Sequence, residues 1–112
     1  MRTWGTVILV GALLSLGGSV GATTEPAAPA AQHSVVLENM QIDPPQLTVH
    51  RGDRIVWVNK DLFPHTVTAT NKTFDSGSIE AGGSWSWVAA SSGEFPYGCT
   101  FHPTMKGTVK VQ

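Results

Sequence analysis

Apolar and polar residues follow two different patterns along this chain. Residues 5–20 form an apolar run relieved only by small or hydroxyl residues, whereas residues 34–112 alternate between apolar and polar positions in short segments. Alternation with a period of two is typical of half-buried β-strands, and the glycine, proline and aspartate residues between segments indicate turns. The predicted strands are residues 34–40, 46–50, 54–59, 65–70, 84–87, 94–99 and 108–112, with one more short strand between residues 74 and 83. This pattern predicts an all-β sandwich of seven to eight strands without helices.

The position of apolar residues within each strand predicts which side chains face the core. Alternation places the following residues inward: His65, Val67, Ala69, Trp85, Trp87, Phe95, Tyr97, Cys99, Val109 and Val111. The strand at residues 54–59 differs, because isoleucine and tryptophan occupy one face and two valines occupy the other. We therefore expect that strand to be buried on both sides, near the middle of a sheet.

The chain divides into three parts. Residues 1–22 combine one positive charge, an apolar segment and a small-residue exit at Ala22, which is typical of a secretory signal peptide. A membrane anchor is the alternative, but the glycines and the shortness of the run favour cleavage. Residues 23–33 are rich in alanine and proline and predict a flexible arm, which leaves residues 34–112 as one small folded domain.

The charge balance gives no reason to expect nucleic acid or an anionic membrane surface as a partner. The whole chain has 7 basic and 8 acidic residues and a formal charge of −1. Residues 1–22 contain one arginine and no acidic residue, so 6 basic and 8 acidic residues remain after cleavage, for a charge of −2. A net charge this close to zero does not indicate a polyanionic partner.

The candidate chemistry lies near the C-terminal end, where Cys99, His102 and Met105 follow one another at intervals of three residues. Thiolate, imidazole and thioether groups are soft or borderline metal ligands. Because Pro103 lacks a backbone N–H and restricts the residue before it, a tight loop around one ion is favoured over a helix. His65 is the best candidate for a second imidazole. Two histidines, one cysteine and a weakly bound methionine are the set typical of a blue-copper site.

Alternative interpretations of these residues stay open at this stage. Zinc would accept the thiolate and both imidazoles, although it makes little use of a thioether. Cys99 is the only cysteine, and it could be a buried inert thiol, but in an oxidising compartment metal ligation would protect it. His33 and His50 lie outside any donor cluster, and we expect them on the arm and on a polar strand face. Met40 is an alternative axial donor that we expect in the core.

Several motifs together resemble those of the cupredoxins, and within them the amicyanins, with related similarity to plastocyanin and pseudoazurin. The motifs are Trp57-Val58-Asn59, Pro64-His65-Thr66-Val67, Phe74-Asp75-Ser76-Gly77, Gly98-Cys99-Thr100 and His102-Pro103-Thr104-Met105. The two residues between His102 and Met105 match the short amicyanin-type loop, whereas plastocyanin and pseudoazurin have a longer gap. This chain has Thr66 and Phe101 where the family often has asparagine and proline. The first difference affects the hydrogen bonds between the two ligand loops, and the second affects the hydrogen bonds or packing near the Cys99 sulfur.

The resemblance implies a Greek-key β-sandwich that binds one copper ion, as Cu(I) or Cu(II). The implied equatorial ligands are His65, Cys99 and His102, and the implied axial ligand is Met105. It further implies a monomeric periplasmic electron carrier, not an enzyme, that docks briefly with a dehydrogenase or a c-type cytochrome. The implied docking residues surround His102 and are Phe63, Pro64, Phe101 and Pro103.

Two other functions compete with an electron carrier. A periplasmic copper-binding or delivery protein would hold the same ion without cycling it, and rapid loss of copper on reduction would favour that function. An enzyme using Cys99 and His102 as nucleophile and base would leave His65 and Met105 without roles.

Overall fold

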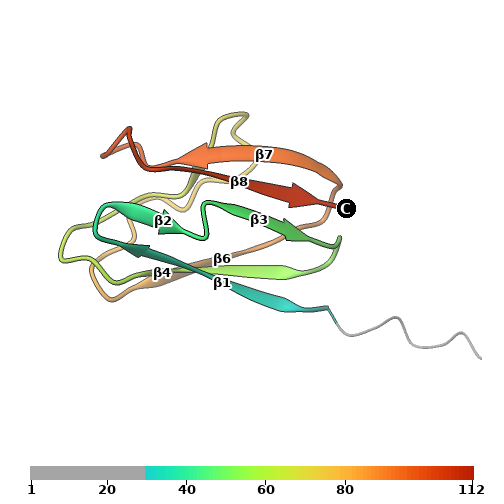
Figure 1. Ribbon diagram of the computed structural model, residues 1–112, viewed down its shortest axis with the longest axis horizontal. Helices are drawn as coiled ribbons and strands as arrows, with labels where there is room; N and C mark the ends of the chain where they lie inside the picture. The colour runs from blue at the N-terminus through green and yellow to red at the C-terminus, as the bar shows by residue number, and fades with distance from the viewer. Residues whose placement is uncertain (1–29) are drawn as a thin grey trace, which may run out of the picture.

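The computed structural model of the protein describes residues 30–112, which form two four-stranded β-sheets packed face to face (Figure 1). The first sheet contains β1 (Gln32–Glu38), β2 (Gln41–Asp43), β4 (Arg54–Asn59) and β6 (Ser84–Val88). The second contains β3 (Gln46–Val49), β5 (Thr68–Ala69), β7 (Gly93–Gly98) and β8 (Lys106–Val111). These eight strands confirm the predicted all-β sandwich. Residues 30–112 contain no helix, and therefore none suited to crossing a membrane.

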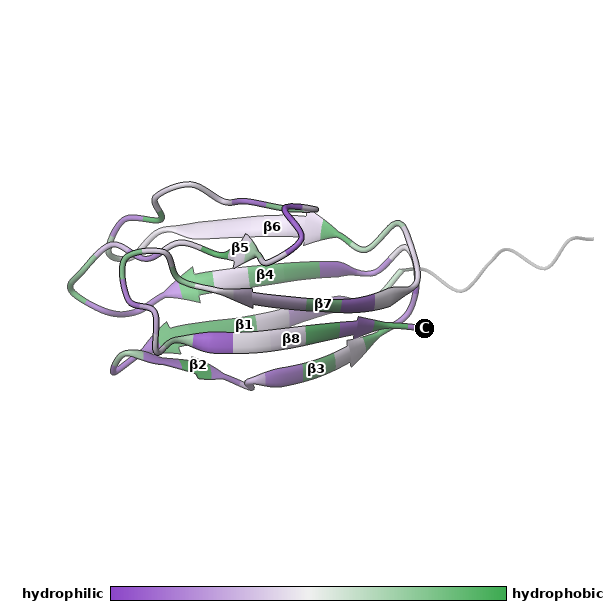
Figure 2. Ribbon diagram, turned by 90° about the horizontal axis from the view of Figure 1, so that it is seen from above, coloured by the Kyte–Doolittle hydropathy of each residue, from purple (hydrophilic) through white to green (hydrophobic). Residues whose placement is uncertain are grey.

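The order of strands brings the ends of β4 and β7 to one end of the sandwich. The order is β2-β1-β4-β6 in the first sheet and β3-β8-β7-β5 in the second. β4 runs parallel to β1, and the arrows of β1 and β7 both end at the left in Figure 1. The loops that follow β4 and β7 therefore lie close together. Seen from above, β8 alternates between hydrophilic and hydrophobic residues, as expected for a strand with one face in the core (Figure 2).

Trp57 occupies the centre of the core and is fully buried. Its ring centroid lies 5.5 Å from that of Tyr97 and 5.8 Å from that of Phe74. Its Nε1–H donates a 3.1 Å hydrogen bond to the Tyr97 hydroxyl, which joins β4 of one sheet to β7 of the other. Burial raises the pKa of Tyr97 to about 12, against a smaller lowering by the Trp57 N–H, so the hydroxyl stays protonated near neutral pH.

Most of the predicted core is confirmed. The residues predicted to face inward that are buried are His65, Val67, Ala69, Phe95, Tyr97, Cys99, Val109 and Val111. Trp85 and Trp87 are only half-buried and pack against the edge of this core. The prediction that β4 is buried on both sides was wrong for its outer face, where Val56 and Val58 are half-buried. Its central place in the sheet, between β1 and β6, is confirmed.

The observed strands differ from the prediction in several places. The prediction of a short strand between residues 74 and 83 was wrong, because Asp75 and Ile79 make only isolated bridges there. β1 begins at Gln32, inside the predicted arm, because it pairs with β4 from that residue onward. β2 was not predicted, since three residues are too few to show alternation. The strand expected at residues 65–70 is reduced to β5, because His65 makes only an isolated bridge to Ile79. The predicted signal peptide (residues 1–22) and residues 23–29 of the arm lie outside the described residues.

Asp53, in the turn between β3 and β4, anchors the N-terminal end of β1. Its carboxylate accepts hydrogen bonds from the backbone N–H groups of Ala31 and His50, both at 3.0 Å. His33 Nε2 lies 2.9 Å from the same carboxylate. The hydrogen bond with His33, followed by those from the backbone, lowers the pKa of Asp53 to about 2 although burial acts in the opposite direction. The expectation that His33 belongs to a flexible arm was therefore wrong.

This geometry predicts acid sensitivity that depends on Asp53. Because the pKa of Asp53 is about 2 in the folded chain and 3.8 without these contacts, its stabilisation is present above about pH 4 and lost as the pH falls toward 2. We expect Asp53→Asn to be less stable than the wild type at neutral pH and to approach it near pH 2. Denaturant unfolding of both proteins across this range measures the difference. A difference in unfolding free energy that stays constant with pH would contradict the account. Glu94→Gln, at an exposed residue, is the control.

Candidate metal centre

The loop that follows β7 curls back on itself and carries three of the four candidate donors. Cys99 comes directly after β7, and its backbone N–H donates to the Met105 carbonyl at 3.1 Å. The Met105 N–H in turn donates to the His102 carbonyl at 3.0 Å, which closes a tight turn. A Cβ atom on Gly98 would lie 2.9 Å from the Met105 carbonyl oxygen, so this close approach requires glycine. The expected loop, in place of a helix, is confirmed.

The loop that follows β4 is held in shape by the buried side chain of Asn59. The Asn59 amide donates to the carbonyls of Phe63 at 2.8 Å and Ile79 at 2.9 Å, and its oxygen accepts the Asp61 N–H at 2.9 Å. His65 then exchanges two backbone hydrogen bonds with Ile79, at 3.1 and 2.7 Å. These contacts fix the backbone of His65 beneath the loop and leave its side chain fully buried. Asn59 was not predicted to have a role of its own in the site.

Three donor atoms from these two loops converge. His65 Nδ1 lies 3.7 Å from Cys99 Sγ, and His102 Nδ1 lies 4.0 Å from the same sulfur. All three donor atoms lie within 4.8 Å of one another. The two imidazole rings meet edge to face, with centroids 5.0 Å apart. His65 and Cys99 are buried, whereas His102 is half-exposed. The sequence prediction brought these three residues together correctly, although 34 positions separate His65 from Cys99.

Comparison with known proteins agrees with this geometry. A family described as the cupredoxin-like domain matches residues 6–111. The chain belongs to the cupredoxin family. Amicyanin-alpha of Methylorubrum extorquens is 28% identical over 90 residues, which cover 76% of each chain. Amicyanin of Paracoccus denitrificans is 28% identical over 93 residues, covering 77% of this cupredoxin and 71% of that protein.

Solved structures are similar as well. A methionine-to-alanine variant of amicyanin with Cu(I) superposes with a TM-score of 0.67 and 28% identity, covering 79% of this cupredoxin and 87% of that chain. These relationships confirm the predicted resemblance to amicyanins. They also support the prediction that the protein is not an enzyme.

The donor set fits one type 1 copper ion. Metal–donor bonds of about 2.0–2.3 Å at trigonal angles separate donor atoms by roughly 3.5–3.8 Å. The sulfur–nitrogen distances of 3.7 and 4.0 Å are close to this range, so an ion fits between the three atoms after small movements. Together with Met105, these two imidazoles and one thiolate form the set typical of a type 1 copper centre.

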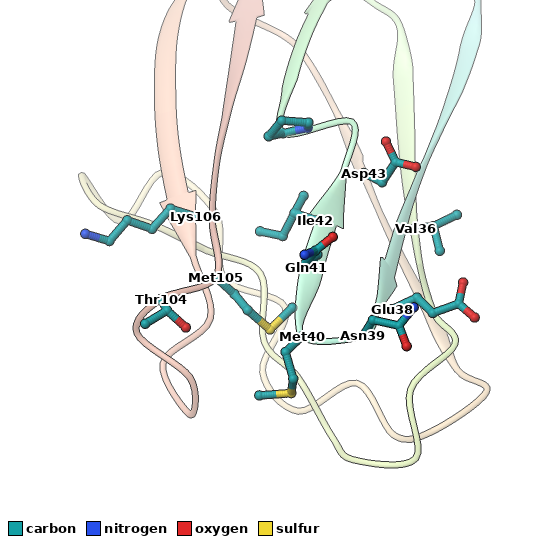
Figure 3. A pocket seen from close by; sticks show the side chains of 11 residues that line it. Val36, Glu38, Asn39, Met40, Gln41, Ile42, Asp43, Thr104, Met105 and Lys106 are labelled. Atoms are coloured by element: carbon teal, nitrogen blue, oxygen red, sulfur yellow. The ribbon is translucent and has the colours of Figure 1, made fainter.

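Met105 lies where the C-terminal loop enters β8 and is 1% exposed. It forms part of the wall of a surface pocket of about 460 Å³, which Met40 also lines (Figure 3). Met40 belongs to the turn between β1 and β2 and is 39% exposed, so the expectation that it lies in the core was wrong. Burial next to Cys99 and His102 favours Met105 over Met40 as the thioether donor.

Thr66 ties the two loops of this cupredoxin together. Its backbone N–H donates to Cys99 Sγ at 3.3 Å, the hydrogen bond expected to stabilise a thiolate. Its hydroxyl oxygen accepts the Thr100 N–H at 2.8 Å and lies 3.1 Å from the Thr100 hydroxyl. Thr66 therefore connects the loop after β4 to the loop after β7.

Asp61 contacts the back of His65, on the side away from Cys99. Its carboxylate lies 2.6 Å from His65 Nε2 and also accepts the N–H groups of Asn39 and Met40. Burial raises the pKa of Asp61, but the hydrogen bonds from His65, Met40 and Asn39 together outweigh it and leave the pKa below its usual value. Asp61 was not predicted to belong to the site. The available signal was its place four positions before His65, a candidate ligand.

The other two histidines take no part in the cluster. His33 pairs with Asp53 in the turn before β4, and His50 is exposed immediately after β3. Among residues 30–112, the only group of three or more histidine, cysteine or acidic residues with metal-binding geometry consists of His65, Cys99 and His102. The expectation that His33 and His50 lie outside the site is confirmed.

The Thr66 contacts predict a measurable loss of stability in a valine variant. Thr66→Val keeps the branched shape but leaves the Thr100 N–H without its partner, so we expect the free energy of unfolding to fall by about 1–2 kcal/mol. Urea unfolding of the metal-free chain measures this change. Thr104→Val, at an exposed threonine of the neighbouring loop, serves as the control and should change stability little. Equal losses in both variants would show that the hydroxyl of Thr66 does not connect the loops.

Proposed function

We propose that this protein is a periplasmic blue-copper electron carrier in which His65, Cys99, His102 and Met105 bind one copper ion. The observation that carries the proposal is the convergence of His65 Nδ1 and His102 Nδ1 on Cys99 Sγ, at 3.7 and 4.0 Å, with the sulfur accepting a backbone N–H. A bound copper ion supplies a one-electron couple between Cu(II) and Cu(I). Relatedness to amicyanins, one of them solved with Cu(I), supports the same conclusion.

The surroundings of the donors suit an ion that changes charge without changing its ligands. The backbones of Cys99 and His65 are both hydrogen-bonded, to Met105 and to Ile79, and both side chains are buried. Met105 is 1% exposed, and its backbone is hydrogen-bonded to Cys99 and His102. Ligands that are held in place in advance move little when an electron arrives, which favours rapid transfer.

An apolar surface next to His102 provides a docking face. We define this face by Leu62, Phe63, Pro64, Phe101 and Pro103, which border the two imidazole ligands in the sequence. Leu62 is 89% exposed, Phe63 59% and Phe101 52%, and exposed aromatic and aliphatic side chains that gather in one place mark interaction sites. Half-exposed His102 lies between Phe101 and Pro103, so a partner on this face would come within a few ångströms of a copper ligand. A small apolar contact releases quickly, as turnover requires.

The periplasmic location is part of the proposal and is supported by the N-terminal sequence alone. Residues 1–22 have the charge, apolar run and small-residue exit of a secretory signal. A lone cysteine in an oxidising compartment gains protection from metal ligation, which agrees with export.

Copper loading gives the first test of this function. We expect the oxidised copper-loaded protein to show intense visible absorption near the red end of the spectrum, from charge transfer between the Cys99 sulfur and copper. Cys99→Ser should lose this absorption, whereas His50→Ala, at an exposed histidine outside the cluster, should keep it. A colourless copper complex of the wild type would refute the proposal. Repeated reduction and oxidation should leave copper bound; rapid loss of copper on reduction would favour a delivery protein instead.

Electron exchange between oxidised and reduced molecules of the protein tests the docking face. We expect Phe101→Lys to slow this exchange by roughly tenfold, because the lysine removes apolar contact and places like charges opposite each other in the encounter. Val88→Lys is the matched control, since Val88 is 45% exposed on β6. Line broadening in nuclear magnetic resonance spectra of mixed samples measures the rate, with the visible spectrum showing that the site is intact. Equal effects of the two lysines would contradict the assignment of this face.

A further inference from the structure

One carboxylate connects the metal centre to the hairpin formed by β1 and β2. Asp61 Oδ1 accepts the Asn39 N–H at 2.6 Å, and Oδ2 accepts the Met40 N–H at 3.1 Å. The same Oδ2 lies 2.6 Å from His65 Nε2. The side chain of Asp61 is 11% exposed; its contact with His65 is partly buried, whereas its two contacts with the turn are exposed. A single group thus joins two backbone donors of one turn to a candidate copper ligand.

The hairpin turn has a conformation that needs such an anchor. Asn39 and Met40 have φ angles of 54° and 58°, the left-handed region, and they connect paired residues Glu38 and Gln41. A two-residue hairpin loop with both φ angles positive suits asparagine and glycine, and a methionine there is uncommon. Both N–H groups of this turn point at Asp61, so its carboxylate stabilises the turn at the same time as it contacts His65.

The contact with His65 fixes the ring in one orientation. Because Nε2 faces a carboxylate that only accepts hydrogen bonds, the proton of the neutral ring belongs on Nε2. Nδ1 is then unprotonated and faces Cys99 Sγ at 3.7 Å, as a metal ligand requires. A ring turned over would lose the hydrogen bond to Asp61 and direct a proton into the cluster.

We propose that Asp61 is a positioning residue that selects the Nε2–H form of His65 and lowers the reduction potential of the bound copper. This inference rests on the proposed function. A carboxylate that accepts the ring proton increases the electron density on Nδ1 and makes His65 a stronger donor. A stronger nitrogen donor favours Cu(II) over Cu(I), so weakening the acceptor should favour the reduced form.

Three variants separate this role from simple support of the turn. Asp61→Asn removes the charge from the acceptor, and Asp61→Glu restores a carboxylate on a longer side chain. Asp43→Asn is the matched control, because it removes the same charge from the same hairpin at an exposed position on β2. A role confined to the turn would change stability but would move neither the proton on His65 nor the potential.

The reduction potential of the copper-loaded protein is the first measurement. We expect Asp61→Asn to shift the equilibrium toward the reduced form by about tenfold, which is 59 mV for one electron, with Asp61→Glu closer to the wild type. Asp43→Asn should shift it much less. Equal potentials in the wild type and Asp61→Asn, or equal shifts in Asp61→Asn and Asp43→Asn, would overturn the proposal.

The position of the ring proton is the second measurement and needs no metal. In the metal-free wild-type chain at about pH 8, where an ordinary imidazole is neutral, nitrogen-15 resonance spectra should show His65 protonated on Nε2. Protonation on Nδ1 would overturn the proposal even if Asp61→Asn does not fold. If the wild type fails to form a coloured copper complex, the proposed function is wrong, whereas the form of His65 still decides whether Asp61 orients the ring.

Discussion

The metal centre depends on hydrogen bonds that join the loop after β4 to the loop after β7. Thr66 supplies them, through its N–H to Cys99 Sγ at 3.3 Å and through its hydroxyl, which accepts the Thr100 N–H at 2.8 Å. Without them, the buried imidazole of one loop and the thiol of the other would be free to move apart. A donor set assembled from distant parts of the chain needs this kind of link, because each loop alone positions only part of the set.

Contacts in the core also hold the two loops in place, because they join the strands that carry them. Trp57 of β4 and Tyr97 of β7 pack edge to face and share a hydrogen bond of 3.1 Å, so the strands that carry the two loops are fixed relative to each other. Asn59 then shapes the first loop, and the contact between Gly98 and the Met105 carbonyl shapes the second. Rigid packing of this sort keeps ligands in place in both redox states, which agrees with the role of an electron carrier.

The sequence predicted the sandwich and the donor cluster because both leave strong local signals. Period-two alternation marked most of the strands, and the spacing of Cys99, His102 and Met105 marked the loop. Features set by contacts between distant residues were harder to predict. β5 is short because residues near His65 bridge to Ile79 and not to a neighbouring strand, and Asp61 acquires its role only when the turn at Asn39 folds beside it. The bridge between His65 and Ile79 and the contact between Asp61 and Asn39 each join distant residues, so neither can be read from one segment alone.

The central claim, that the fold prepares the copper ligands before the ion binds, is tested most directly by crystal structures of the full chain with and without copper. The account predicts that His65 Nδ1, Cys99 Sγ and His102 Nδ1 all lie about 2.0–2.3 Å from one ion. It also predicts that these atoms move by less than about 0.5 Å between the two structures. An ion bound elsewhere, or a His65 ring that turns away from Cys99 when the metal is removed, would contradict it.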